Sequence, residues 1–179
     1  MDVLTHGSFP RSGNHLLNTI LKFSYPSCAV KWIEHNAWLS LKEKNFICIV
    51  RDPLLCSVSW ITLSQDSREN RSDIVLNWYN RYHKSMMKND NALLIDFNKL
   101  INNPSMLNNA IYNRSGIKND LDIPNDFYFN YMSVIHPDNF PKEESDEKNV
   151  LIDEIKNSSE YRNAKKIYKN ILKRANNEF

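Results

Sequence analysis

Arginine, serine and glycine stand together in SFPRSGNHLL, residues 8–17, between a run typical of a strand and a run typical of a helix. A turn that enters a helix leaves backbone N–H groups unpaired and carries the positive end of the helix dipole. These two features together bind anions, and phosphate groups in particular. Gly13 lets the backbone approach a ligand closely, and Arg11 adds a full positive charge. The segment therefore predicts a phosphate-binding loop.

The loop lacks the residues that mark magnesium-dependent nucleotide triphosphatases, whose loop reads GxxxxGK[ST]. When the second glycine of that pattern is aligned with Gly13, Ser8 takes the place of the first glycine. Asn14 then stands at the lysine, and His15 at the hydroxyl that binds magnesium. Because these positions differ, we expect a phosphate-containing ligand that is held without a metal ion.

The stretch PRSGNHLL resembles the PRSGTTxL or PKSGTTxL loop of sulfotransferases that use 3′-phosphoadenosine 5′-phosphosulfate (PAPS). In that family the loop holds the 5′-phosphosulfate of the donor, largely through backbone N–H groups. The resemblance implies a donor-binding loop that consists of Arg11, Ser12, Gly13, Asn14 and His15. Asn14 and His15 depart from the threonine pair of the family. Arg11 is also expected to stabilise negative charge on the leaving 5′-phosphate.

A second stretch, FICIVRDPLLCSVSW at residues 46–60, resembles the second signature of the same family. That signature is a strand ending in VR(D/N)P, followed by a serine eight residues after the arginine, and here the pair is Arg51 and Ser59. The resemblance implies that the forked guanidinium of Arg51 and the hydroxyl of Ser59 bind the 3′-phosphate of the donor. Asp52 fits the N-cap, and Pro53 the first position, of the helix that follows.

Between the two signatures lies VKWIEHNAW, residues 30–38, where the family often has a strand ending in KTH. The histidine of KTH removes the proton of the acceptor, and His35 takes that place here. An imidazole ionises near neutral pH and suits this role. Glu34 is the alternative base, because some branches of the family use a glutamate. Trp32 and Trp38 are interpreted as core residues, with the lining of an acceptor pocket as the alternative.

The order of apolar runs predicts an α/β fold. Runs that indicate strands lie at residues 3–9, 28–33, 46–50 and 92–97. Helical patterns between and after them lie at residues 13–21, 38–41, 53–63, 74–87, 104–111 and 161–174. This alternation predicts three layers, with a central parallel sheet of four to five strands flanked by helices. The resemblance implies the P-loop NTPase-like fold of sulfotransferases.

The chain length of 179 residues fits a single domain, residues 1–179. The likeness to sulfotransferases covers residues 3–117, and a helical C-terminal part follows at 150–176. The family's later RKGxxGDW loop has no counterpart here. Lys142 and Lys148 are the two candidates to take its role.

The acidic stretch from His136 to Asn149 has no periodicity and is predicted to be an exposed connection without chemistry. His6, His15, His83 and His136 are predicted to be surface or capping residues. The basic side of the last helical pattern is interpreted as a solvated face.

Composition excludes several classes of protein. Charged residues make up 25% and hydrophobic residues 41%, as in soluble globular proteins. The net charge of +2 is too small to indicate a nucleic-acid or membrane surface. The longest aliphatic run is too short to span a bilayer, and no secretion signal is apparent. Cys28, Cys48 and Cys56 lack CxxC spacing, so we expect free thiols and a cytoplasmic protein.

The function expected from the sequence is transfer of a sulfuryl group from PAPS to a hydroxyl or amine acceptor by in-line displacement. His35 would be the base, no metal would be required, and adenosine 3′,5′-bisphosphate (PAP) would be the second product. The alternatives are a nucleotide or small-molecule kinase, which would need ATP and magnesium, and a non-catalytic nucleotide-binding domain. The acceptor, whether small molecule, glycan or peptide, and the oligomeric state stay open.

Overall fold

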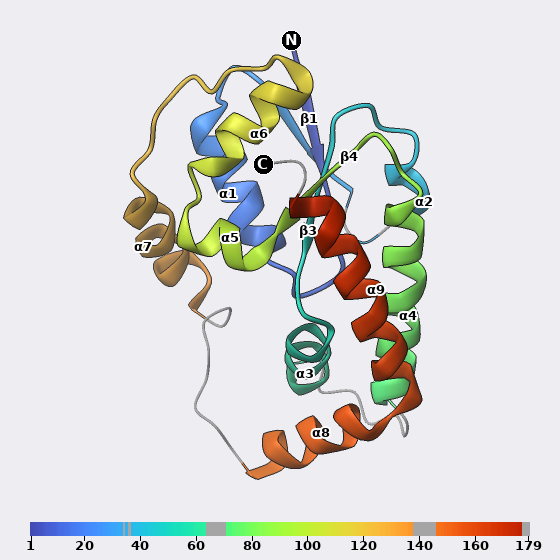
Figure 1. Ribbon diagram of the computed structural model, residues 1–179. Helices are drawn as coiled ribbons and strands as arrows, with labels where there is room; N and C mark the ends of the chain where they lie inside the picture. Colours follow the sequence, from blue (N-terminus) through green and yellow to red (C-terminus); the bar gives the residue numbers. More distant parts are fainter. Residues whose placement is uncertain (34, 36, 64–70, 138–145, 177–179) are drawn as a thin grey trace.

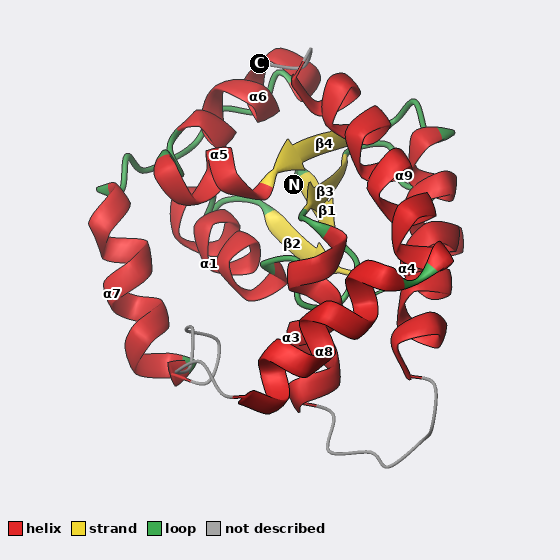
Figure 2. Cartoon of the chain, turned by 60° about the horizontal axis from the view of Figure 1, so that its bottom comes forward, coloured by secondary structure: helices red, strands yellow, loops and turns green. Residues whose placement is uncertain are grey.

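The computed structural model describes residues 1–33, 35, 37–63, 71–137 and 146–176, with the backbone alone described at 37 and 38. Within this part of the chain, the centre is a parallel four-stranded sheet in the order β2-β1-β3-β4. Figure 2 shows this sheet enclosed by helices. The strands are β1 (Val3–His6), β2 (Ala29–Trp32), β3 (Phe46–Val50) and β4 (Ala92–Asp96).

Helices cover both faces of the sheet (Figure 1), so the predicted three-layer α/β fold is confirmed. The apolar layer on one face includes residues of α1 (Asn14–Ser24), α5 (Phe97–Asn102) and α6 (Met106–Ser115), and α7 (Asn125–Ile135) packs on the outer side of α1. The layer on the other face includes residues of α3 (Pro53–Leu63), α4 (Arg71–Met87) and α9 (Ser159–Asn176), and α8 (Asp146–Asn157) packs against these helices. The short helix α2 (Ala37–Ser40) precedes β3.

Strand β3 lies in the middle of the sheet, and all of its residues are buried. Phe46, Cys48 and Val50 face one apolar layer, while Ile47 and Ile49 face the other. An unbroken apolar run is what a strand covered on both faces requires. Because β3 pairs with β1 in parallel, the loop after β1 and the residue after β3 lie at the same edge of the sheet.

Several boundaries differ from those predicted. Strand β1 ends at His6 rather than at Phe9, because the chain then leaves the sheet and the Ser8 hydroxyl accepts a hydrogen bond from Ile49 N at 2.7 Å. Helix α5 is not predicted by the apolar pattern; it begins where the Asp96 carboxylate accepts a hydrogen bond from Asn98 N at 2.9 Å. The predicted connection at 136–149 is shorter, since α8 already begins at Asp146.

Pro53 begins α3 as predicted, and the Asp52 carboxylate caps it by accepting from Leu54 N at 2.8 Å. The predicted apolar face of α9 packs into the core, with Ala164 and Ile171 fully buried. Cys28, Cys48 and Cys56 are free thiols, as predicted. No helix among the described residues is long and apolar enough to cross a bilayer.

Two histidines predicted to be surface or capping residues are instead fully buried: His6 and His83. His6 Nε2 donates to Asn18 Oδ1 at 3.1 Å, and His83 Nδ1 donates to the Tyr79 carbonyl at 3.0 Å. Burial lowers the pKa of each imidazole to about 4, because charging a ring in the interior is costly.

Stability should therefore fall in acid. The folded protein takes up protons at these rings only near pH 4, whereas the unfolded chain does so near pH 6.5, so stability is lost as the pH falls from about 6.5 to 4. The loss amounts to about 3 kcal/mol for each ring. Urea unfolding at pH 7.5, 5.5 and 4.5 should show this decline, and His83→Phe should reduce it. An equal pH slope in the variant would contradict the assignment of this loss to His83.

Candidate functional site

The loop between β1 and α1 has a strained backbone. Arg11 has a φ of 61° and is the one non-glycine residue with a positive φ among the described residues, while Gly13 has a φ of 99°. A left-handed conformation costs a non-glycine residue about 1–2 kcal/mol. Such strain persists where neighbours hold it, and it is common at functional sites. Here the Arg11 carbonyl accepts a hydrogen bond from Arg51 Nη1 at 2.7 Å.

The buried side chains of Ser12 and Asn14 stabilise the loop from its interior side. The Ser12 hydroxyl lies 3.4 Å from Cys56 Sγ, and Ser12 N donates to the Phe9 carbonyl at 3.2 Å. The Asn14 amide donates to the carbonyls of Ser8 and Phe9 at 3.4 and 3.3 Å. Because both side chains face the interior, a ligand at this part of the loop would meet backbone groups.

Helix α1 begins directly after the loop, with Gly13 at its N-cap. The first backbone bond along the helix runs from Leu17 N to the Gly13 carbonyl at 3.0 Å. The N–H groups of residues 14–16 therefore have no partner within the helix, as in the first turn of any α-helix. These N–H groups and the positive end of the helix dipole are the two features on which the predicted anion-binding loop depends.

Gly13 fits against the residue that follows β4. A Cβ atom at Gly13 would lie 2.7 Å from Cε2 and 2.9 Å from Cδ2 of Phe97. The guanidinium of Arg51 lies over the same ring, 4.3 Å from its centroid. Phe97 thus couples the loop to Arg51, a role that the sequence analysis misses because Phe97 stands in a different segment.

The arginines of the two sequence motifs meet at the edge of the sheet. Arg11 Nε donates to Ser59 Oγ at 3.1 Å, and Arg51 bonds to the Arg11 carbonyl. The Tyr79 hydroxyl donates to the Arg51 carbonyl at 2.8 Å and fixes the backbone there. The buried Nε of Arg51 has no hydrogen-bond partner among the described residues. Since Ser59 accepts from Arg11, its own hydroxyl proton can be donated to a ligand.

His35 lies beside this loop. Its Nδ1 is 2.8 Å from the Ser8 carbonyl, and because a carbonyl can only accept, Nδ1 carries the proton. In the neutral ring, Nε2 is then the bare nitrogen that can accept a proton. The rings of Trp60 and Trp78 lie edge-on to His35, each at 6.3 Å between centroids.

Trp60 stands inside the second motif and Trp78 on α4, yet no pattern in the sequence indicates that they meet at His35. Their rings are 5.6 Å apart between centroids. Glu34 lies outside the described residues, as does the side chain of Trp38. Trp32 is not a core residue, because it is 37% exposed and stacks on His6 at 5.6 Å.

The buried cysteine beside Arg11 lacks the lowered pKa that is typical of a nucleophilic thiol. Burial raises the pKa of the Cys56 thiol to about 11, so the thiol stays protonated at neutral pH. Among the described residues, no group of three or more His, Cys, Asp or Glu side chains is arranged to hold a metal ion.

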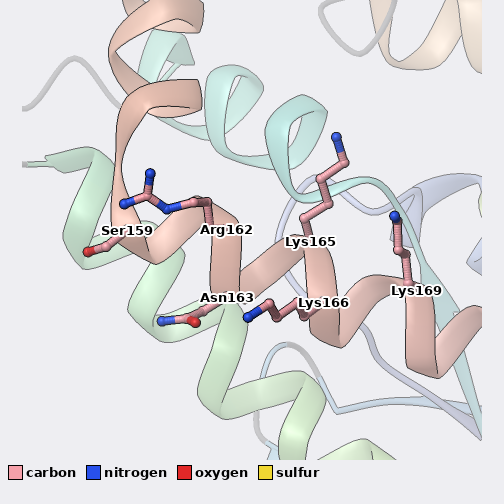
Figure 3. A pocket seen from close by; sticks show the side chains of 6 residues that line it. All are labelled: Ser159, Arg162, Asn163, Lys165, Lys166 and Lys169. Carbon is pink, nitrogen blue, oxygen red and sulfur yellow. The ribbon is translucent and has the colours of Figure 1, made fainter.

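A surface hollow of about 350 Å³ lies along α9 (Figure 3). Its lining residues are Ser159, Arg162, Asn163, Lys165, Lys166 and Lys169. All of them belong to α9, and none belongs to the two motifs. The hollow follows the basic face that the sequence predicts. Of the two lysines that the sequence offers in place of the family's RKGxxGDW loop, Lys148 lies on α8 and Lys142 lies outside the described residues.

Comparisons of this chain with protein-family models, with curated proteins and with solved structures find no match. Its function is therefore inferred from the two sequence motifs and from the contacts that join them.

Proposed function

We propose that this protein is a sulfotransferase that moves a sulfuryl group from PAPS to a hydroxyl or amine acceptor. The observation that carries the proposal is the junction of the two motifs: Arg11 contacts Ser59, and Arg51 contacts the backbone of Arg11. One nucleoside bearing a 5′-phosphosulfate and a 3′-phosphate needs two such anion-binding groups close together.

The residues present fit this donor. On the 5′ side, the N–H groups at the start of α1 and the Arg11 guanidinium would hold the phosphosulfate. On the 3′ side, the unpartnered Nε of Arg51 and the hydroxyl proton of Ser59 are donors that a phosphate would satisfy. Burial of an arginine N–H without a partner is costly, and a bound phosphate would remove that cost.

In this proposal, His35 acts as the general base through Nε2. The acceptor oxygen or nitrogen forms a bond to sulfur while the bond from sulfur to the bridging oxygen of the 5′-phosphate breaks. The acceptor proton passes to Nε2, and the electron pair of the broken bond stays on the 5′-phosphate of PAP. Arg11 and the first turn of α1 stabilise that negative charge.

Replacing Arg51 with lysine tests the 3′-phosphate assignment, because lysine keeps the charge but loses the fork. With EDTA present, PAP should bind the wild type at least tenfold more tightly than 5′-AMP, which lacks the 3′-phosphate. Arg51→Lys should weaken PAP binding by about tenfold to a hundredfold, or about 1.4–3 kcal/mol, and should change AMP binding far less. Isothermal titration calorimetry measures both affinities.

Arg81→Lys on the exposed surface of α4 is the matched control and should bind PAP like the wild type. Equal affinity of the wild type for PAP and AMP would refute the 3′-phosphate site. A requirement for magnesium together with a preference for ATP would indicate the kinase alternative. Tight PAP binding without release of PAP from PAPS, across phenol, glycan and peptide acceptors, would indicate a non-catalytic binding domain.

A further inference from the structure

Two histidines that are 121 positions apart in the chain contact each other next to the loop between β1 and α1. His15 lies in the first turn of α1, and His136 occupies the C-cap of α7. Their ring centroids are 4.4 Å apart, with an interplanar angle of 48°. Trp32 on β2 packs edge-on against His15 at 5.2 Å and limits the positions of its ring.

The surroundings of this pair are basic. Burial is the main cause that lowers the pKa of His15, and the nearby His136, Arg11 and His35 lower it further. Among the described residues, no carboxylate forms an ion pair with His15 or His136. Arg11, His35 and His136 therefore lie near His15. In the described part of the chain, no ion pair with a carboxylate compensates positive charge on the His15 or His136 ring.

We propose that His15 and His136 form a proton-linked binding pair for the sulfuryl end of the donor. The inference rests on the proposed function for the identity of that anion. Each ring can donate a hydrogen bond to an anionic oxygen, and binding of the anion makes it favourable for the pair to take up a proton. His15 stands in the first turn of α1, directly after Asn14, and Arg11 and His35 lie near enough to affect its pKa.

This pair offers a physical reason why His15 stands where the sulfotransferase loop has a threonine. Where that loop has a threonine hydroxyl, whose charge does not change with pH, this chain has an imidazole with a second imidazole against it. Donor affinity should then depend on pH in a way that a hydroxyl would not produce. We expect wild-type affinity for PAPS to fall about tenfold between pH 6 and pH 8, because binding takes up a proton that becomes scarcer as the pH rises.

Calorimetry can measure the proton uptake directly. PAPS, without acceptor, is titrated at pH 7 in two buffers that differ in ionisation enthalpy, using the wild type, His15→Asn and His136→Asn. The 3′-phosphate of the ligand exchanges protons in the same way in every titration, so the difference between proteins reports the histidines. Both variants should take up fewer protons and lose most of the pH dependence. Ser133→Asn, at an exposed position on α7, is the matched control and should behave like the wild type.

Proton NMR identifies the rings involved. The imidazole signals are followed from pH 5 to 8.5 with and without PAPS, and the two variants assign His15 and His136. Their titration midpoints should move to higher pH in the complex, while the signal of buried His83 should stay in place. PAPS binding with equal proton uptake in the wild type and both variants would overturn the inference.

The inference and the proposed function can fail separately. If PAPS does not bind at any pH, the proposed function fails, and sodium sulfate becomes the probe because its charge is constant over this range. Movement of the two titration midpoints in sulfate would still support an anion-binding histidine pair. Unchanged midpoints in sulfate would overturn it.

Discussion

Replacing His35 with alanine is expected to slow sulfuryl transfer by about 10²–10⁴-fold while PAP affinity stays within about twofold. The reason is the direction of its hydrogen bond: Nδ1 donates to the Ser8 carbonyl, which leaves Nε2 to accept the proton of the acceptor. The donor contacts proposed here come from Arg11, Arg51 and Ser59, so they should survive the change. Rates of PAP release and calorimetry with PAP measure the two quantities.

His35→Asn separates catalysis from support of the loop. The asparagine amide can still donate to the Ser8 carbonyl, but it cannot act as a base. Both variants should therefore transfer the sulfuryl group about 10²–10⁴-fold more slowly than the wild type. Glu34→Gln should retain activity. If instead His35→Ala turns over normally and Glu34→Gln does not, the base is Glu34.

The second large effect is expected at Gly13. Gly13→Ala should lower the free energy of unfolding by about 3 kcal/mol, because the added Cβ overlaps the Phe97 ring and the residue must keep a φ of 99°. It should also weaken PAP binding by tenfold or more, since the ring that would be displaced supports the Arg51 guanidinium. Urea unfolding and calorimetry measure these changes.

Gly116→Ala is a matched control, because Gly116 also has a positive φ, of 73°, but nothing lies within 4 Å of a Cβ there. It should lose only about 1–2 kcal/mol and bind PAP normally. In the double variant Gly13→Ala/Phe97→Leu, part of the stability should return without the affinity. If the two glycine variants behave alike, contact with Phe97 has no role in holding Arg51.

Local patterns in the sequence determine most of the framework. The unbroken apolar run at 46–50 predicts a strand covered on both faces, and β3 is that strand. The pair Asp52 and Pro53 predicts the start of α3, since a cap and a fixed φ act within a few residues. The glycine and arginine of the first loop predict a turn that binds an anion, and that function stays a prediction.

Local sequence patterns do not predict the burial of a residue that is covered by elements far away in the chain. His6 and His83 give no local sign that they are buried, because helices and strands from other parts of the chain cover them. The end of β1 is set by Ser8, whose hydroxyl bonds to Ile49 on a neighbouring strand.

The candidate site itself is decided by the tertiary structure. The contact between Arg11 and Ser59 joins residues 48 positions apart, and His35 reaches Ser8 across 27 positions. The pairing of His15 with His136 brings α7 to the start of α1. Sequence alone determined which residue types were available and which helices and strands carry them. Only the parallel register of the sheet and the packing of its two helical layers decided which strand ends are neighbours, because those contacts depend on long-range burial and not on local spacing.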